Sequence, residues 1–277
     1  GKSTAMKILT TYLHPTRGTA QVNDIAVLRD PVGVRKVIGY LPEILPLYMD
    51  MEVRDYLKFV GKARGLRGAE LQRRTDVVVE EVGLKAMYRK VIRELSKGYK
   101  QRTGLAQALI HDPNVIILDE PTSGLDPHQI VEIRHLIRTL AEGRTVILST
   151  HILQEVEASA DRIVIINEGK IVADGTVDEL RSKVGDDERT LISVEAKRTD
   201  AEKALSGLSG VQRVEFSGET NGHSSFMLHG KPGSELWREA GALAKSSNWA
   251  VRELSDKPLT LEETFLSLTE RQQGGAK

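Results

Sequence analysis

The sequence predicts an α/β protein with a buried parallel sheet at its core, followed by a smaller α+β domain. Val115 to Leu118 form a short apolar run that ends abruptly in two acids, which is typical of a buried parallel strand at the carboxyl edge of its sheet. Beyond a polar stretch at 183–189, the expected order is strand, helix, strand, strand, helix, strand, which fits a ferredoxin-like split unit. We therefore expect a first domain over 1–183 and an accessory domain over 190–277.

The composition excludes several classes of function. The 277 residues include 39 basic and 39 acidic side chains, with net charge +0 and pI ≈ 7.3. Such a balance gives no global basic field, so no nucleic-acid partner is expected. There is no cysteine, which excludes disulfides and thiol catalysis. No apolar run approaches the roughly 20 residues needed to cross a bilayer. We expect a cytosolic chain, whose membrane-spanning part, if it drives transport, is a separate chain.

The first residues, Gly1-Lys2-Ser3-Thr4, match the end of the phosphate-loop pattern G-x-x-x-x-G-K-[ST] and precede a helix expected to run to about Leu13. Backbone N–H groups at such a helix start bind phosphate, Lys2 can reach the β- and γ-phosphates, and the Ser3 hydroxyl can bind Mg²⁺. The pattern requires roughly five residues before Gly1. We expect an amino-terminally truncated reading frame, whose product alone binds ATP very weakly and hydrolyses none detectably.

Asp119 and Glu120 supply the other half of a nucleotide site. In P-loop NTPases an Asp at the end of such a strand holds Mg²⁺, and a neighbouring residue orients or deprotonates the attacking water. Two solvated acids that simply end a strand are the alternative. Together with the phosphate-loop pattern, the pair favours nucleotide hydrolysis.

A hairpin and a strand are expected between these two motifs. The hairpin spans 19–28 and turns at Asn23-Asp24, and the strand covers 37–41. Glu43 follows this strand. It is either an exposed loop acid or a ligand of a hard cation, which accepts carboxylate oxygen.

Two helices are expected next. Asp50 is placed to cap the first, which carries apolar residues at helical spacing and ends near Gly65. The second runs from about Ala69 to Val82. Together they belong to a helical subdomain over about 44–111. Packing only against each other is the alternative to contact with a partner protein.

Further motifs flank the acid pair. Ser96 and Gly98 begin a helix expected to run through about Ile110, where a hydroxyl and a bare backbone suit the close approach of an anion. An ordinary helix cap is the alternative role for Ser96. Residues 123–126, Ser-Gly-Leu-Asp, come just after the acids. His151 follows the next expected strand and is a further candidate site residue. The alternative is that this histidine is structural or simply exposed.

These residues resemble the motifs of ATP-binding cassette (ABC) ATPases, which are P-loop NTPases with a parallel-sheet core and a helical subdomain. Ser96 and Gly98 look like the signature motif, and 123–126 look like the D-loop. The form Leu-Ser-Lys-Gly-Tyr has Lys97 and Tyr99 where the commonest family sequence has glycine and glutamine. It is similar to the ABC-2-type export and gliding-motility branch. Five motifs in the family's order cover about the first 180 residues.

The resemblance implies that ATP and Mg²⁺ are the ligands. It also implies that the signature motif meets ATP bound to a second ATPase subunit, either a copy of this chain or a paralogue. Glu43 stands where most members have a glutamine, whose neutral carbonyl oxygen coordinates instead. The implied residues are Gly1, Lys2, Ser3, Thr4, Ser96, Gly98 and Asp126 for the nucleotide, Ser3, Glu43 and Asp119 for the metal, and Glu120 and His151 for catalysis.

The other expectations concern structure rather than chemistry, since no catalytic constellation is found beyond His151. They are a helix over 127–141, a strand over 145–149, a hairpin over 162–173, capping boxes at Thr176/Glu179 and Thr260/Glu263, core positions for Trp237 and Trp249, and surface positions for His223 and His229.

We therefore expect an ATP-binding and ATP-hydrolysing subunit, peripheral on the cytoplasmic face of the membrane, that powers a separate integral membrane permease of the ABC-2-type exporter class. A soluble non-transport ABC ATPase is one alternative. The single cassette and the absence of a long coiled-coil arm between Glu43 and Ser96 count against it. A module that binds nucleotide without hydrolysis is the other alternative, and the presence of Glu120 and His151 counts against that.

Overall fold

A computed structural model describes residues 1–184, 188–231 and 233–274. The chain forms two compact units, Gly1–Ser159 and Ala160–Lys277. The two units meet at residues 159 and 160, whereas the predicted domain boundary lies at 183–190. Which of the two divisions separates parts that fold independently remains a prediction. In the described part of the chain, no helix is long and apolar enough to cross a membrane.

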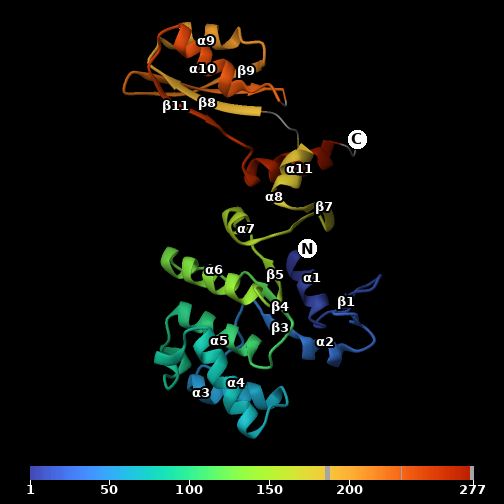
Figure 1. Cartoon of the computed structure of the whole chain (residues 1–277). Helices are drawn as coiled ribbons and strands as arrows, with labels where there is room; N and C mark the ends of the chain where they lie inside the picture. The colour runs from blue at the N-terminus through green and yellow to red at the C-terminus, as the bar shows by residue number, and fades with distance from the viewer. Residues whose placement is uncertain (185–187, 232, 275–277) are drawn as a thin grey trace. The chain divides into compact units, whose positions relative to one another are not determined.

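The first unit is built around a short parallel sheet (Figure 1). Its elements are α1 (Lys2–Leu9), β1 (Gln21–Val22), β2 (Ile25–Ala26), α2 (Pro31–Val37), β3 (Ile38–Leu41), α3 (Val53–Ala63), α4 (Gly68–Glu81), 3₁₀ turns at Lys85–Met87 and Ile92–Glu94, α5 (Lys97–Leu109), β4 (Val115–Asp119), α6 (Pro127–Ala141), β5 (Thr145–Ser149) and α7 (Leu153–Ser159).

The sheet has the order β3-β4-β5, and both pairings are parallel. All five residues of the central strand β4 are buried, because helices cover both faces. Successive side chains of a strand point to opposite faces. Val115 and Ile117 therefore pack with Met6 of α1 and with α2, whereas Ile116 and Leu118 pack toward α5 and α6. The predicted parallel-sheet core is confirmed.

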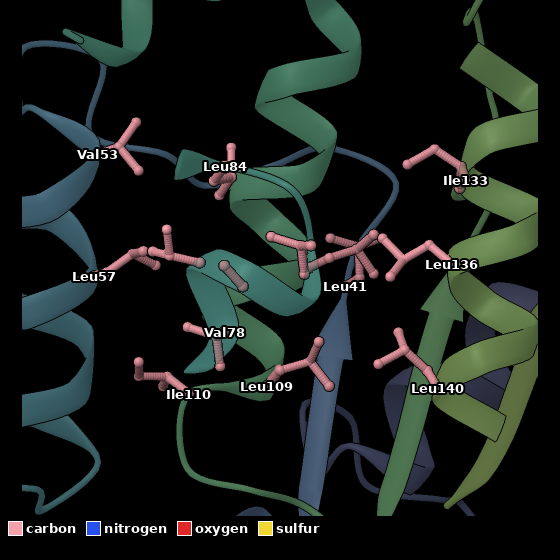
Figure 2. Packing of buried hydrophobic residues seen from close by; sticks show 14 of the residues in the cluster. Leu41, Val53, Leu57, Val78, Leu84, Leu109, Ile110, Ile133, Leu136 and Leu140 are labelled. Atoms are coloured by element: carbon pink, nitrogen blue, oxygen red, sulfur yellow. The ribbon is translucent and has the colours of Figure 1, made fainter. Parts of the chain in front are cut away.

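The larger core cluster joins this sheet to the helical subdomain. Figure 2 shows Leu41 of β3 among side chains from α3, α5 and α6. Leu57, Val78 and Leu109 are fully buried, and Leu136 is nearly so. Burying a side chain of this kind stabilises the fold by about 1.5–3 kcal/mol. The helices are therefore held to the sheet by ordinary apolar packing.

Most predicted elements of this unit are found, with differences at helix starts and ends. Helix α1 ends at Leu9, short of its predicted end, because Thr11 adopts a left-handed turn with φ of 63°. Asp50 does not cap α3, so that prediction is wrong. Glu52 is the residue before the helix and makes no side-chain cap, while Asp50 pairs with Arg93. Helices α2 and α7 were not predicted.

The second unit begins with a hairpin and contains an antiparallel sheet. Its elements are β6 (Ile163–Asn167), β7 (Lys170–Gly175), α8 (Val177–Val184), β8 (Glu188–Val194), α9 (Arg198–Ser206), β9 (Val211–Thr220), β10 (His223–Gly230), α10 (Leu236–Ser246), β11 (Val251–Asp256) and α11 (Leu261–Gly274). The sheet order is β11-β8-β10-β9, and α9 and α10 pack on it. This arrangement confirms the predicted ferredoxin-like unit.

Helix α11 contacts α8 and β7, which is why the segment 160–184 groups with the second unit. Both predicted capping boxes are present, since Glu179 and Glu263 each accept from the backbone of the threonine three residues earlier. The prediction for Trp237 is wrong: the residue is 43% exposed. Trp249 does pack against the core. His229 is partly exposed: its side chain is 17% exposed and lies 3.4 Å from Glu215 Oε2.

Candidate functional site

The candidate site lies at the carboxyl edge of the parallel sheet, where β4 and β5 end side by side. Asp119 and Ser149 are paired in register at these ends, and each is 3% exposed. The Ser149 hydroxyl donates a hydrogen bond to Asp119 Oδ1. Because a buried carboxylate is costly without partners, this bond helps to hold Asp119 in place.

Glu120 follows in a strained backbone conformation. Its φ is 50°, a left-handed value that is uncommon outside glycine, and its N–H donates to the carbonyl of Ser149 at 3.0 Å. Strain of this kind clusters at functional sites. The side chain is 12% exposed, and Oε2 accepts a hydrogen bond from His151 Nδ1 at 2.8 Å. Since a carboxylate can only accept, the hydrogen lies on Nδ1.

Lys2 joins this group from the first turn of α1. Its Nζ lies 3.9 Å from Glu120 Oε1 and donates to the Thr150 carbonyl at 2.9 Å. Gly1 is the residue before the helix and, having no side chain, gives it no side-chain cap. The positive Lys2 side chain thus lies close to the Glu120 carboxylate from the start of a helix. That combination suits a phosphate group and a hard cation.

The electrostatics of the sheet edge also reach Tyr40 of β3. Burial, then the charge of Asp119, raise the pKa of the Tyr40 phenol. Asp119 supplies carboxylate oxygens of the kind that binds Mg²⁺, which is usually bound through one or two carboxylates together with substrate phosphates and waters. Within the described residues, no group of three or more acids or histidines is arranged to hold a metal.

Glu43 is exposed two residues beyond the end of β3. Its side chain makes no hydrogen bond or ion pair in the described part of the protein. Thr4 is likewise exposed on α1, whereas Ser3 is half-buried. The metal roles of Glu43 and Ser3, and the nucleotide role of Thr4, remain predictions.

The signature residues and the D-loop lie beside each other. Ser96 caps α5 and accepts from the N–H of Tyr99 at 3.4 Å, and Asp126 caps α6 by accepting from the N–H of Gln129 at 2.9 Å. A Cβ on Gly98 would lie 2.9 Å from the Gln129 side chain. A side chain at position 98 would therefore have to displace the Gln129 side chain of α6.

Gly124, within the D-loop, has φ of +67°, and a Cβ there would collide with the Lys97 ammonium. Lys97 therefore lies over the D-loop of its own chain. Among the residues that the structure describes, no hydrogen bond or ion pair joins Ser96, Gly98 or Asp126 to the Lys2–Asp119–Glu120–His151 group. The candidate residues form two separate sets within one chain.

Sequence reasoning missed four residues around this site: Ser149, Thr150, Thr122 and Glu155. Glu155 is 1% exposed and accepts from the hydroxyls of Thr122 and Thr150 at 2.8 and 3.1 Å. The one signal in the sequence was an acid a single helical turn beyond His151. That spacing does not reveal the partners, which come from other segments.

Comparison with known proteins places the chain in a family. Residues 1–123 match the family described as ABC transporter. The chain is 33% identical over 273 residues to the daunorubicin resistance ATP-binding protein DrrA3 of Streptomyces coeruleorubidus, covering 97% of this chain and 84% of that protein. It is 36% identical over 185 residues to the bacitracin transport ATP-binding protein BcrA of Bacillus licheniformis, covering 66% and 60%.

The fold agrees with these similarities. A solved structure of an ATP binding subunit of an ABC transporter superimposes with a TM-score of 0.59 at 33% identity, covering 66% of this chain and 77% of that one. Full-length similarity to DrrA3 extends through the second unit as well as the first. The chain therefore belongs to the ABC transporter family and is one of its ATP-binding subunits.

Proposed function

We propose that this chain binds Mg·ATP and hydrolyses it to power a separate membrane permease of an exporter. Proteins of this family are ATPases that couple hydrolysis to transport. The names of similar proteins, which refer to daunorubicin resistance and bacitracin transport, favour export. The chain would then act at the cytoplasmic face of the membrane through its partner.

The convergence of Lys2, Asp119, Glu120 and His151 carries this proposal. Lys2 and the start of α1 bind the phosphates, and Asp119 with Ser3 holds Mg²⁺. The ion, when bound, neutralises developing phosphate charge. Glu120 accepts a proton from the attacking water or orients it, since it is the less buried of the two acids and hydrogen bonds to an exposed histidine. His151 holds that carboxylate and faces the γ-phosphate.

The separation of the two sets of candidate residues supports a dimer. Ser96 and Gly98 lie at the start of α5, and Asp126 lies at the start of α6. Among the described residues, no hydrogen bond or ion pair joins them to the Lys2 group of the same chain. A second ATPase subunit in head-to-tail orientation would bring its signature residues to the ATP bound at Lys2. Each hydrolytic site would then be complete only between two subunits.

A patch of exposed apolar side chains supports contact with the permease. Ile44 is 85% exposed, Tyr48 54%, Met49 44% and Phe59 47%. The Tyr48 and Phe59 rings lie 5.4 Å apart between centroids. Contiguous exposed apolar groups mark protein interaction sites. This patch begins just after Glu43 in the sequence. A change at Glu43 on ATP binding can therefore alter the surface that a partner docked at this patch contacts.

The test is Mg²⁺-dependent ATP hydrolysis, measured on a form in which the phosphate-loop pattern is completed ahead of Gly1, here called the extended form. The chain beginning at Gly1 is measured beside it. We expect hydrolysis in the extended form and its loss in Asp119→Asn, because the amide removes the charge that holds the metal. Binding of ATP without any turnover in the extended form would support the non-hydrolysing alternative and overturn the proposal.

A further inference from the structure

A buried carboxylate connects the two loops that carry the candidate catalytic residues. Glu155 lies on α7, and its side chain is 2% exposed. One atom, Oε2, accepts hydrogen bonds from Thr122 Oγ1 at 2.8 Å and from Thr150 Oγ1 at 3.1 Å. The other oxygen lies 3.7 Å from the guanidinium of Arg134. These contacts offset part of the cost of burying the carboxylate, whose Oε1 is buried without a hydrogen bond among the described residues.

Each of the two threonines lies close in sequence to a candidate catalytic residue. Thr122 comes two residues after Glu120, in a turn closed by a bond from the Ser123 N–H to the Glu120 carbonyl at 3.1 Å. Thr150 comes immediately before His151. Oε2 of Glu155 therefore fixes the separation between the loop of Glu120 and the loop of His151.

Thr150 is held on several sides at once. Its hydroxyl donates to Glu155 and accepts from the Ile152 N–H at 3.1 Å, and its carbonyl accepts from Lys2 Nζ at 2.9 Å. The segment around His151 is thus tied both to the phosphate-loop lysine and to Glu155. Removing the Glu155 carboxylate takes away the acceptor of the Thr150 hydroxyl, so the backbone that places His151 loses one support.

We propose that Glu155 is a positioning residue for ATP hydrolysis, which keeps the Glu120 and His151 loops in register so that the two side chains stay hydrogen bonded. The inference rests on the proposed ATPase function. It assigns no contact with ATP to Glu155. A residue of this kind affects the geometry needed in the transition state more than the binding of the substrate, because the phosphate ligands themselves are unchanged.

The first experiment compares Glu155→Ala and Glu155→Gln in the extended form. Both threonines donate to the same oxygen, so the amide oxygen of glutamine can accept both bonds. We expect Glu155→Ala to lower kcat at least about tenfold while KM for ATP changes less than about threefold, and Glu155→Gln to stay within about threefold of the parent kcat. Gln154→Ala, at an exposed position on the same helix, is the matched control.

A cycle of variants separates positioning from general stability. Thr122→Val and Thr150→Val each remove one hydroxyl with little change of shape, and both are expected to lower kcat. Adding Glu155→Ala to the double threonine variant should then cost little more, because the same contacts are already gone. Additive losses would show that Glu155 acts by another route. If Glu155→Ala does not fold, the valine variants still test the proposal.

A second readout does not depend on hydrolysis. The Ile152 N–H exchanges with solvent only when its bond to Thr150 Oγ1 opens, so Glu155→Ala should accelerate its hydrogen exchange at least about tenfold, and Glu155→Gln should not. Unchanged exchange in Glu155→Ala overturns the inference whatever the ATPase result. Accelerated exchange in a chain whose parent hydrolyses no ATP would instead count against the proposed function alone.

Discussion

Ser149→Ala removes the hydrogen bond that the Ser149 hydroxyl donates to Asp119 Oδ1 at the ends of β4 and β5. Both side chains are 3% exposed, so water does not readily replace the missing donor. The substitution changes little else, because the backbone pairing of the two strands does not involve the side chain.

The size of the effect follows from this burial. A hydrogen bond to a charged group contributes about 1.5–3 kcal/mol, and a buried acceptor that loses its donor keeps the full cost of its desolvation. We therefore expect the free energy of unfolding to fall by about 1.5–3 kcal/mol. For a unit of about 150 residues, that corresponds to a decrease in Tm of about 3–12 °C.

Urea denaturation and calorimetry measure this change directly. Thr145→Ala is the matched control, because Thr145 is an exposed residue at the start of the same strand. The control is expected to change stability by less than about 0.5 kcal/mol. If Ser149→Ala is no more destabilising than Thr145→Ala, then Asp119 does not depend on this bond, and the account of how the site is held is wrong.

Three other predictions concern separate parts of the chain. If Glu43 senses the metal, Glu43→Gln should be mild because an amide oxygen still coordinates, and Glu43→Ala should lower ATPase activity clearly more; equal, unaltered rates would reduce Glu43 to a surface acid. Burial, then the charge of Arg64, lower the pKa of His111 to about 4. The unfolded state therefore binds more protons between pH 6.5 and 4, and the free energy of unfolding falls by up to about 3 kcal/mol as the pH drops through that window. In His111→Gln the slope of unfolding free energy against pH should flatten. An unchanged slope in denaturation curves would contradict this. Deleting residues 185–277 from the extended form should leave ATPase activity, because no candidate catalytic residue lies beyond His151; loss of activity would show that the first unit needs the second. The deletion also removes α11, which contacts α8, so limited proteolysis should cut within 160–184.

Local signals explain which elements the sequence could predict. Helix α6 was predicted residue by residue, because Asp126 caps it, Pro127 occupies its first turn, and Ile133 and Ile137 repeat at helical spacing. The strand β4 was equally clear, since a buried parallel strand is a continuous apolar run. By contrast, α2 runs directly into β3 at Ile38, without the break that normally marks a helix end.

Side-chain directions were harder to predict. Trp237 was expected in the core, but the buried face of α10 is formed by Leu236, Ala240 and Ala244, at intervals of four residues. Trp237 is about 100° away from that face, where the Arg238 guanidinium lies 5.3 Å from its ring. Hydrophobicity alone does not reveal which side of a helix faces the core.

The candidate site was predictable as a set of motifs but not as a network. Lys2, Asp119, Glu120 and His151 stand out by residue type and position after strands or before a helix. Glu155 does not, because its meaning depends on two threonines, one of them 33 residues earlier in the chain. Contacts across such separations follow from the packing of α7 beside the sheet edge, which no local pattern encodes.

The central claim is that Glu120 acts on the attacking water, and Glu120→Gln tests it most directly in the extended form. General-base catalysis contributes about 10²–10⁴-fold, or about 3–5 kcal/mol of barrier, and glutamine keeps the shape while removing the base. Glu142→Gln, an exposed acid at the end of α6, is the control. The account predicts that Glu120→Gln still binds Mg·ATP, loses at least about a hundredfold in kcat and accumulates an ATP-dependent dimer on size exclusion. Turnover close to that of the parent would contradict it and place the activation of water elsewhere.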